Sequence, residues 1–400
     1  MPPVLQRLFR SFFRIAHFMV CVVVSAFVSG LATLTLSLKV FNPIERAFAD
    51  FSVTDIYFTI MRSEANKELN PDIVLVDITK QHRRGEIAQT IRDIAACQPR
   101  LVVFDLIFQV HGDDEFGNME LMEALEELPR KVMACKLTDY SPAKGEFTGI
   151  VKSFFSDLAP YDWAYANVPK NLHGGTLRNF TLSQPCQRKT YYSLPYLTAC
   201  AYQGKAPYTE DTSEHPINFG NTDFITIPCD SVRRYANLLQ DRIVIVGTMT
   251  EETDMHMTAL GKLPGMKMQA FATYTCMQHG GATRMGRIKA LLLMFILCYL
   301  SAWAGYEITQ RFAKSRISWV SIYYFLLTAF LVWASFLCFV HYNYIVSLTL
   351  PLLGIALVEK SRTYYGWFIG LIRRHPTWKR LNRLVCHSIY YTPSNSYKLP

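Results

Sequence analysis

Three stretches of the chain carry no Asp, Glu, Lys or Arg, and they interrupt an otherwise mixed pattern of apolar and polar residues. They cover residues 15–38, 290–306 and 317–358. At about 1.5 Å per residue, a helix formed by the first stretch is longer than the roughly 30 Å core of a bilayer. The third stretch is too long for one helix and contains a short polar turn at 341–343. We therefore expect four transmembrane helices, one amino-terminal and three carboxy-terminal, at residues 15–39, 287–308, 317–340 and 343–359.

Residues 40–285 instead alternate short apolar runs with amphipathic segments. The runs 73–77, 101–105 and 243–246 are almost wholly apolar, which is typical of strands that are covered on both faces. Segments 85–97 and 119–128 place apolar residues at helical spacing. This order of strands and helices predicts an α/β domain with a mostly parallel sheet. The remaining predicted elements are strands at 132–137, 163–167, 180–182 and 224–227, and helices at 192–202 and 265–277.

The formal net charge of +9 is distributed unevenly along the chain. Residues 40–285 hold 24 Lys and Arg against 30 Asp and Glu, a net charge of −6, whereas the rest of the chain has a net charge of +15. The basic clusters fall on one side of a membrane that is crossed four times, and the positive-inside rule makes that side the cytoplasm. We expect residues 1–14 and the basic tail 360–400 to be cytoplasmic and residues 40–285 to be extracytoplasmic. The positive charge therefore reflects membrane topology and does not indicate nucleic-acid binding.

Acidic and histidine side chains follow the apolar strands. Because ligands of open α/β sheets bind beyond the carboxyl ends of the strands, we expect the residues at these ends to converge. They are Asp77, Asp105, His111, Asp113, Gly247, Asp254 and His256. Such a group would suit a divalent cation, or a cationic or polyol ligand. The competing interpretation is that the strand-end aspartates cap the following turns and that the loop acids are only solvated.

Catalytic motifs do not accompany these residues. The patterns HExxH, GxSxG and GxGxxG do not occur in the sequence. Arg178 follows Gly174 and Gly175, and it either contacts an anionic group of a ligand or stabilises its own turn. The sequence therefore predicts ligand-binding residues, with no catalytic residue, no metal and no cofactor.

A set of short segments occurs in a recognisable order: PDIVLVD at 71–77, VVFDLIF at 102–108, GTLR at 175–178, INFG at 217–220, IVIVG at 243–247, then Asp254, LPG at 263–265, Gln269 and Ala270. Together they resemble the second class of CHASE domains, which are extracytoplasmic sensory modules of bacterial histidine kinases, adenylate cyclases and related receptors. The resemblance covers roughly residues 45–285. Gln269 stands where histidine is frequent in that family.

The resemblance implies a bacterial inner-membrane receptor whose residues 40–285 lie in the periplasm and bind an unknown ligand. About forty residues follow the last span, too few for a kinase or cyclase, so we expect the signal to pass to a separate cytoplasmic effector protein or through a homodimer. Two other interpretations stay open. One is a non-signalling envelope scaffold that docks another protein, and the other is an envelope enzyme that uses Asp105 and Asp254.

Overall fold

The computed structural model describes residues 11–37, 58, 68–109, 114–156, 162–167, 176–278, 283–313, 315, 318–342 and 344–374. The chain divides into two compact units. One comprises residues 1–47 together with 284–400, and the other comprises residues 48–283. The unit 48–283 contains the candidate site.

A nine-stranded sheet forms the centre of the unit 48–283, and its central strands are parallel. These strands are β1 (Glu68–Asp77), β2 (Leu101–Phe104), β3 (Lys131–Ser141), β5 (Asp162–Tyr165), β10 (Thr222–Pro228) and β11 (Ile243–Gly247). Their order is β10-β1-β11-β2-β3, and β5 also pairs with β3. β11 is the last of them in the chain, yet it lies between β1 and β2. The predicted α/β domain with a mostly parallel sheet is confirmed.

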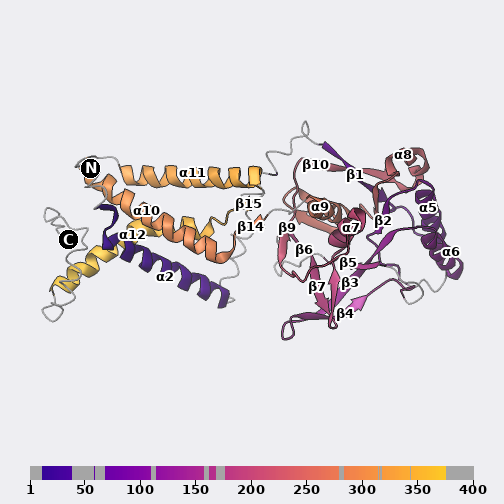
Figure 1. The fold of residues 1–400 in the computed structure, drawn as a ribbon, viewed down its shortest axis with the longest axis horizontal. Helices are drawn as coiled ribbons and strands as arrows, with labels where there is room; N and C mark the ends of the chain where they lie inside the picture. The colour runs from indigo at the N-terminus through magenta and orange to yellow at the C-terminus, as the bar shows by residue number, and fades with distance from the viewer. Residues whose placement is uncertain are drawn as a thin grey trace. The chain divides into compact units, whose positions relative to one another are not determined.

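Three helices cover one face of this sheet (Figure 1). They are α5 (Arg84–Ala96), α6 (Glu115–Glu126) and α8 (Ala236–Leu239). Successive side chains of a strand point to opposite faces, so Val74, Val102 and Val244 turn together towards this layer. They form one buried apolar cluster with Ile91 of α5 and Leu125 of α6. The strands read as nearly continuous apolar runs because the other face is covered as well.

Helices α7 (Leu194–Gln203) and α9 (Gly265–Met277) pack against each other over the opposite face (Figure 1). Ser193 caps α7, since its side chain accepts a hydrogen bond from Tyr196 N at 3.4 Å. Gly204 ends α7 with a φ of +69°, a left-handed conformation that favours glycine. Most residues of α9 are buried. α9 contacts β1 and β11 and is therefore fixed to the centre of the sheet.

The unit 48–283 contains further short strands, and the sequence pattern predicted only the one near 180–182. β3 extends to Ser141 and pairs with β4 (Glu146–Val151), and β7 (Ser183–Cys186) and β8 (Lys189–Tyr192) continue the sheet from β4. Two small antiparallel sheets lie apart from it: β6 (Asn179–Thr181) with β9 (Glu214–Pro216), and β12 (Met255–Thr258) with β13 (Gly261–Pro264). Apart from β6, these strands are short and only partly buried, so they lack the apolar run or the strict alternation that identifies a strand.

The described part of the other unit contains α2 (Ile15–Ser37), α10 (Arg287–Arg311), α11 (Trp319–Tyr342) and α12 (Thr349–Arg374). Val20 and Val24 of α2 are buried in one apolar cluster with Met294 and Cys298 of α10. Val358 of α12 belongs to the same cluster. Three of these helices are therefore held together by apolar side chains.

Two helices among the described residues are long and apolar enough to cross a membrane: 287–311 and 319–339. Four transmembrane helices stay a prediction. α12 begins at Thr349, later than the expected span 343–359, and continues to Arg374, well into the expected basic tail. Pro351 is compatible with this helix because it lies in the first turn, where no backbone N–H is needed for an intrahelical bond.

Candidate functional site

The carboxyl ends of the central strands bring three of the predicted residues into one row. Asp77 of β1 is the register partner of Gly247 of β11. On the other side of β11, the Asp105 N–H donates to Val246 O at 2.9 Å, which places Asp105 at the end of β2 beside Gly247. Because β11 is inserted between β1 and β2, this edge is the kind of position at which open α/β sheets bind ligands.

Asp77 serves the local turn. Its Oδ1 accepts a hydrogen bond from Thr79 N at 2.9 Å and another from the Thr79 hydroxyl. The Thr79 hydroxyl oxygen in turn accepts from Met249 N at 2.9 Å. Asp77 therefore fixes the loop after β11 through Thr79, which favours the capping interpretation for this residue.

Asp105 lies in a different environment, formed together with Asp254 and His256. Asp254 ends the short 3-10 helix Glu252–Asp254, and His256 follows it in β12. The distance from His256 Nε2 to Asp254 Oδ1 is 3.6 Å. Burial, and after it the negative charge of Asp254, raise the pKa of Asp105 to about 7, while His256 opposes this rise. The charge of this group, which we call the edge cluster, therefore changes near neutral pH.

The edge cluster lies at the N-terminus of α9. A Cβ atom on Gly265, the first residue of α9, would be only 2.3 Å from Asp254 Oδ2. Only glycine fits without a shift of the carboxylate or the helix. Gly247 has a similar role, because a Cβ there would lie 3.0 Å from Met266 Sδ. Gly247 is thus explained by the close approach of α9 to the sheet.

The other predicted site residues differ in their placement. The backbone carbonyl oxygen of Arg178 accepts a hydrogen bond from Ile217 N at 2.8 Å. The Arg178 side chain places Nη1 3.5 Å from Thr176 O, within the local turn. His111 and Asp113 lie outside the described residues. In the described part of the chain, no three His, Cys, Asp or Glu side chains are grouped so that they could hold a metal ion.

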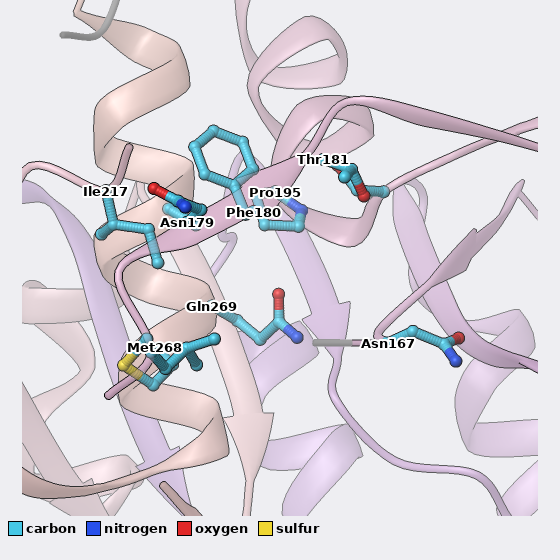
Figure 2. Close-up of a pocket in the computed structure, with 11 residues that line it drawn as sticks. Asn167, Asn179, Phe180, Thr181, Pro195, Ile217, Met268 and Gln269 are labelled. Atoms are coloured by element: carbon cyan, nitrogen blue, oxygen red, sulfur yellow. The ribbon is translucent and has the colours of Figure 1, made fainter. Parts of the chain in front are cut away.

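A cavity beside α9 was not predicted from the sequence (Figure 2). Its space is about that of one water molecule. Its polar lining consists of carboxamides and hydroxyls from α9, β6 and the segments before α7. The lining residues are Asn167, Leu177, Asn179, Phe180, Thr181, Ser193, Pro195, Ile217, Met268, Gln269 and Ala272.

Sequence reasoning missed this cavity because most of its lining comes from the irregular region 138–240, opposite α9. Asn167 was placed at the end of a strand, and its amide in fact bridges to β3: Nδ2 donates to Leu137 O at 2.8 Å, and Oδ1 accepts from Leu137 N at 2.7 Å. Gln269 was noted only as a departure from a histidine. Its Nε2 donates to Ala166 O at 3.0 Å, so it joins α9 to the segment after β5.

Comparison with known proteins identifies a family but no individual relative. Neither a curated protein nor a solved structure is significantly similar to the chain. Residues 21–304 match the model of the CHASE2 domain, a family of extracytoplasmic sensory domains that is not an enzyme family. The match spans well over half of the chain, from within α2 to within α10. The chain therefore belongs to the CHASE2 domain family.

Proposed function

We propose that this protein is a bacterial inner-membrane receptor that binds a periplasmic signal and relays it to a separate cytoplasmic effector protein or within a homodimer. One observation carries the proposal. The CHASE2 match begins inside α2 and ends inside α10, so the sensory unit includes the two helices that flank the α/β domain in the chain. The family match thus covers the α/β domain together with parts of both of these helices.

The proposed membrane arrangement has four spans, with residues 40–285 in the periplasm and residues 1–14 and 360–400 in the cytoplasm. It is supported by the length and apolar character of α10 and α11 and by the net charge of −6 in 40–285 against +15 elsewhere. The packing of α2 against α10 and α12 supports a route for the signal. A ligand that favours one placement of α2 relative to α10 would shift the population of bundle conformations.

For the ligand site, we propose the edge cluster of Asp105, Asp254 and His256. Asp105 is a buried carboxyl with a raised pKa beside a second carboxylate. Such a group favours a cationic or hydroxyl-bearing ligand, because the ligand supplies hydrogen-bond donors to the carboxyl oxygens. Among the described residues, no hydrogen bond reaches the Asp105 carboxyl group, although the carboxyl is only partly exposed. Asp77 is not included, because its oxygen already accepts two local hydrogen bonds.

Thermal unfolding of the full chain in lipid nanodiscs tests this function against divalent metals, sugars, amino acids and periplasmic extracts. A ligand that binds only the folded state raises the midpoint in a concentration-dependent manner. We expect one class of ligand to raise the unfolding midpoint of the parent chain but not that of the double variant Asp105→Ala with Asp254→Ala. If only a protein in the extract raises the midpoint, the envelope scaffold replaces the receptor of small ligands. If nothing does, the receptor proposal is wrong.

A further inference from the structure

We propose that the cavity beside α9 is a second binding site, and that it takes a small uncharged molecule with N–H or O–H donors, an amide or an alcohol. The proposal rests on the sensory function above, because it assigns a ligand class to the same domain. It concerns different residues from the edge cluster. Gln269 is the polar side chain that α9 contributes to the wall of this cavity.

Gln269 offers an acceptor to the cavity. It is only 7% exposed, and its Nε2 is used by the hydrogen bond to Ala166 O at 3.0 Å. Figure 2 shows the amide oxygen directed away from this bond, towards Phe180 and Pro195. No hydrogen bond to this oxygen is present in the described part of the chain. Gln269 lines the cavity, so an occupant that donates a hydrogen bond to this oxygen is favoured over one that cannot.

The remaining polar groups of the wall are held in place by their own contacts. The Tyr165 hydroxyl is 2.8 Å from Thr181 Oγ1 and donates to Thr181 O at 3.2 Å. Asn179 also lines the cavity, and its Nδ2 donates to Glu214 Oε2 at 2.7 Å. Polar side chains that are already held by such contacts need less ordering when an occupant binds.

The charge of the lining selects the class of ligand. None of the eleven residues that line the cavity is Asp, Glu, Lys, Arg or His. A cation or an anion would lose its hydration here without meeting an opposite charge, which is strongly unfavourable. Phe180, Ile217 and Met268 provide apolar contacts. An uncharged molecule with one polar and one apolar end matches this lining.

The cavity must widen slightly for such a molecule, since the present space is about that of one water. Its outer wall includes Asn179, Phe180 and Thr181 of β6, which pairs with β9 in a two-stranded sheet separate from the main sheet. This wall can move without breaking the central strand pairing. The inner wall is α9, which ends at Met277 shortly before α10 begins at Arg287. Occupancy would therefore act on the segment that leads to a proposed membrane helix.

The test compares three probes of similar size on the full chain in nanodiscs at constant ionic strength: acetamide, acetate and ethylammonium. Titrations extend to the upper millimolar range, because molecules this small bind weakly. We expect acetamide to raise the unfolding midpoint by roughly 3–6 °C at ten times its Kd, and the two ions to have no such effect. Hydrogen exchange of residues 265–277 should slow in acetamide alone.

Two variants and a matched control locate the effect. Gln269→Met keeps the side-chain length and removes the acceptor, and Ala272→Leu fills the cavity from α9; both should abolish the acetamide shift. Gln203→Met removes a comparable bond from a glutamine Nε2 to a backbone carbonyl, here Met277 O at 3.4 Å, and should keep the shift. Ala272→Leu decides the question if Gln269→Met does not fold.

An equal shift with acetate, or an acetamide shift that survives both variants, would overturn the assignment, and so would the absence of any shift. The proposed sensory function would still be supported if the panel of metals, sugars, amino acids and extracts contains a ligand that raises the unfolding midpoint only when Asp105 and Asp254 are present. Conversely, an acetamide shift that depends on Gln269, without any effect of the edge-cluster variants, would support this site and reject the edge cluster.

Discussion

Two polar groups of opposite character contact the same helix, α9. The edge cluster lies at its N-terminus, where Asp254 approaches Gly265, and its charge changes near pH 7 because the pKa of Asp105 is raised to about 7. The cavity lies along the middle of α9, where Gln269 is buried among residues that carry no charge. A ligand at the edge cluster should therefore bind with a strong pH dependence, whereas a ligand in the cavity should bind with almost none. The pH profile distinguishes the two sites.

The largest effect is expected from Gln269→Glu, which places an ionisable group in the uncharged cavity. Burial raises the pKa of a carboxyl, so the folded state holds a proton that the unfolded state loses near pH 4. Stability is then retained at low pH and lost as the pH rises. If burial raises the pKa of this Glu to about 7 or higher, the loss at pH 8 relative to pH 4 is about 4–5 kcal/mol. Pulse proteolysis of the full chain in urea measures this difference.

The control for this prediction is Gln203→Glu, on the half-buried end of α7, which should change stability by less than about 1 kcal/mol at either pH. Equal stability of Gln269→Glu at the two pH values would show that water or a cation reaches the cavity. The contrast between the two polar groups would then be lost, and with it the argument for an uncharged ligand.

The sequence predicted the edge of the sheet better than the cavity for a physical reason. Strands such as 243–246 are covered on both faces, so they appear as apolar runs, and their carboxyl ends mark the edge where Asp77, Asp105 and Gly247 meet. Helix 265–277 was predicted with the bounds that α9 has. Parallel pairing then brings together residues that are far apart in the chain.

The roles of individual residues at that edge were not predictable from the pattern. Asp77 and Asp105 both end apolar strands, yet only Asp77 is engaged by a threonine two residues later. The cavity was even harder to predict from the sequence, because β6 and β9 are three-residue strands that pair outside the main sheet. Tertiary contacts such as Gln269 with Ala166 decide these features, and no local periodicity records them.

The second prediction concerns Asp105→Asn, which removes the titrating group from the edge cluster. Because the pKa of Asp105 is raised from its ordinary value to about 7 in the folded state, the parent chain loses stability as the pH rises from about 4 to 7. The neutral variant avoids this loss. At pH 8 we expect it to be more stable than the parent by at most about 4 kcal/mol, and equally stable near pH 4. Pulse proteolysis across this pH range is the measurement; a constant difference at all pH values would contradict the raised pKa.

A smaller effect is expected from Gly265→Ala. The added Cβ would overlap the Asp254 carboxylate, so either the carboxylate or the start of α9 must move. Overpacking of this kind destabilises by about 1–3 kcal/mol. Urea unfolding measures the loss of stability. The control Gly30→Ala in α2, whose Cβ would meet no atom within 4 Å, should leave the stability of the α/β unit unchanged.

Acetamide binding at the cavity should persist in Gly265→Ala if the two sites are separate. Loss of acetamide binding would show that the sites are coupled through α9.

The smallest and most discriminating effects come from the two neighbours of Asp105, which act on its pKa in opposite directions. Removing the negative charge with Asp254→Asn should lower the pKa of Asp105, whereas removing the positive charge with His256→Asn should raise it. Each shift should be less than roughly one pH unit, because both neighbours are partly exposed and water screens their charges. The midpoint of the pH-dependent loss of stability, measured against Asp105→Asn as the baseline, should move down in the first variant and up in the second. The absence of a shift in both variants would mean that burial alone sets the pKa of Asp105. The edge cluster would then be three separate side chains, with no shared charge for a ligand to recognise.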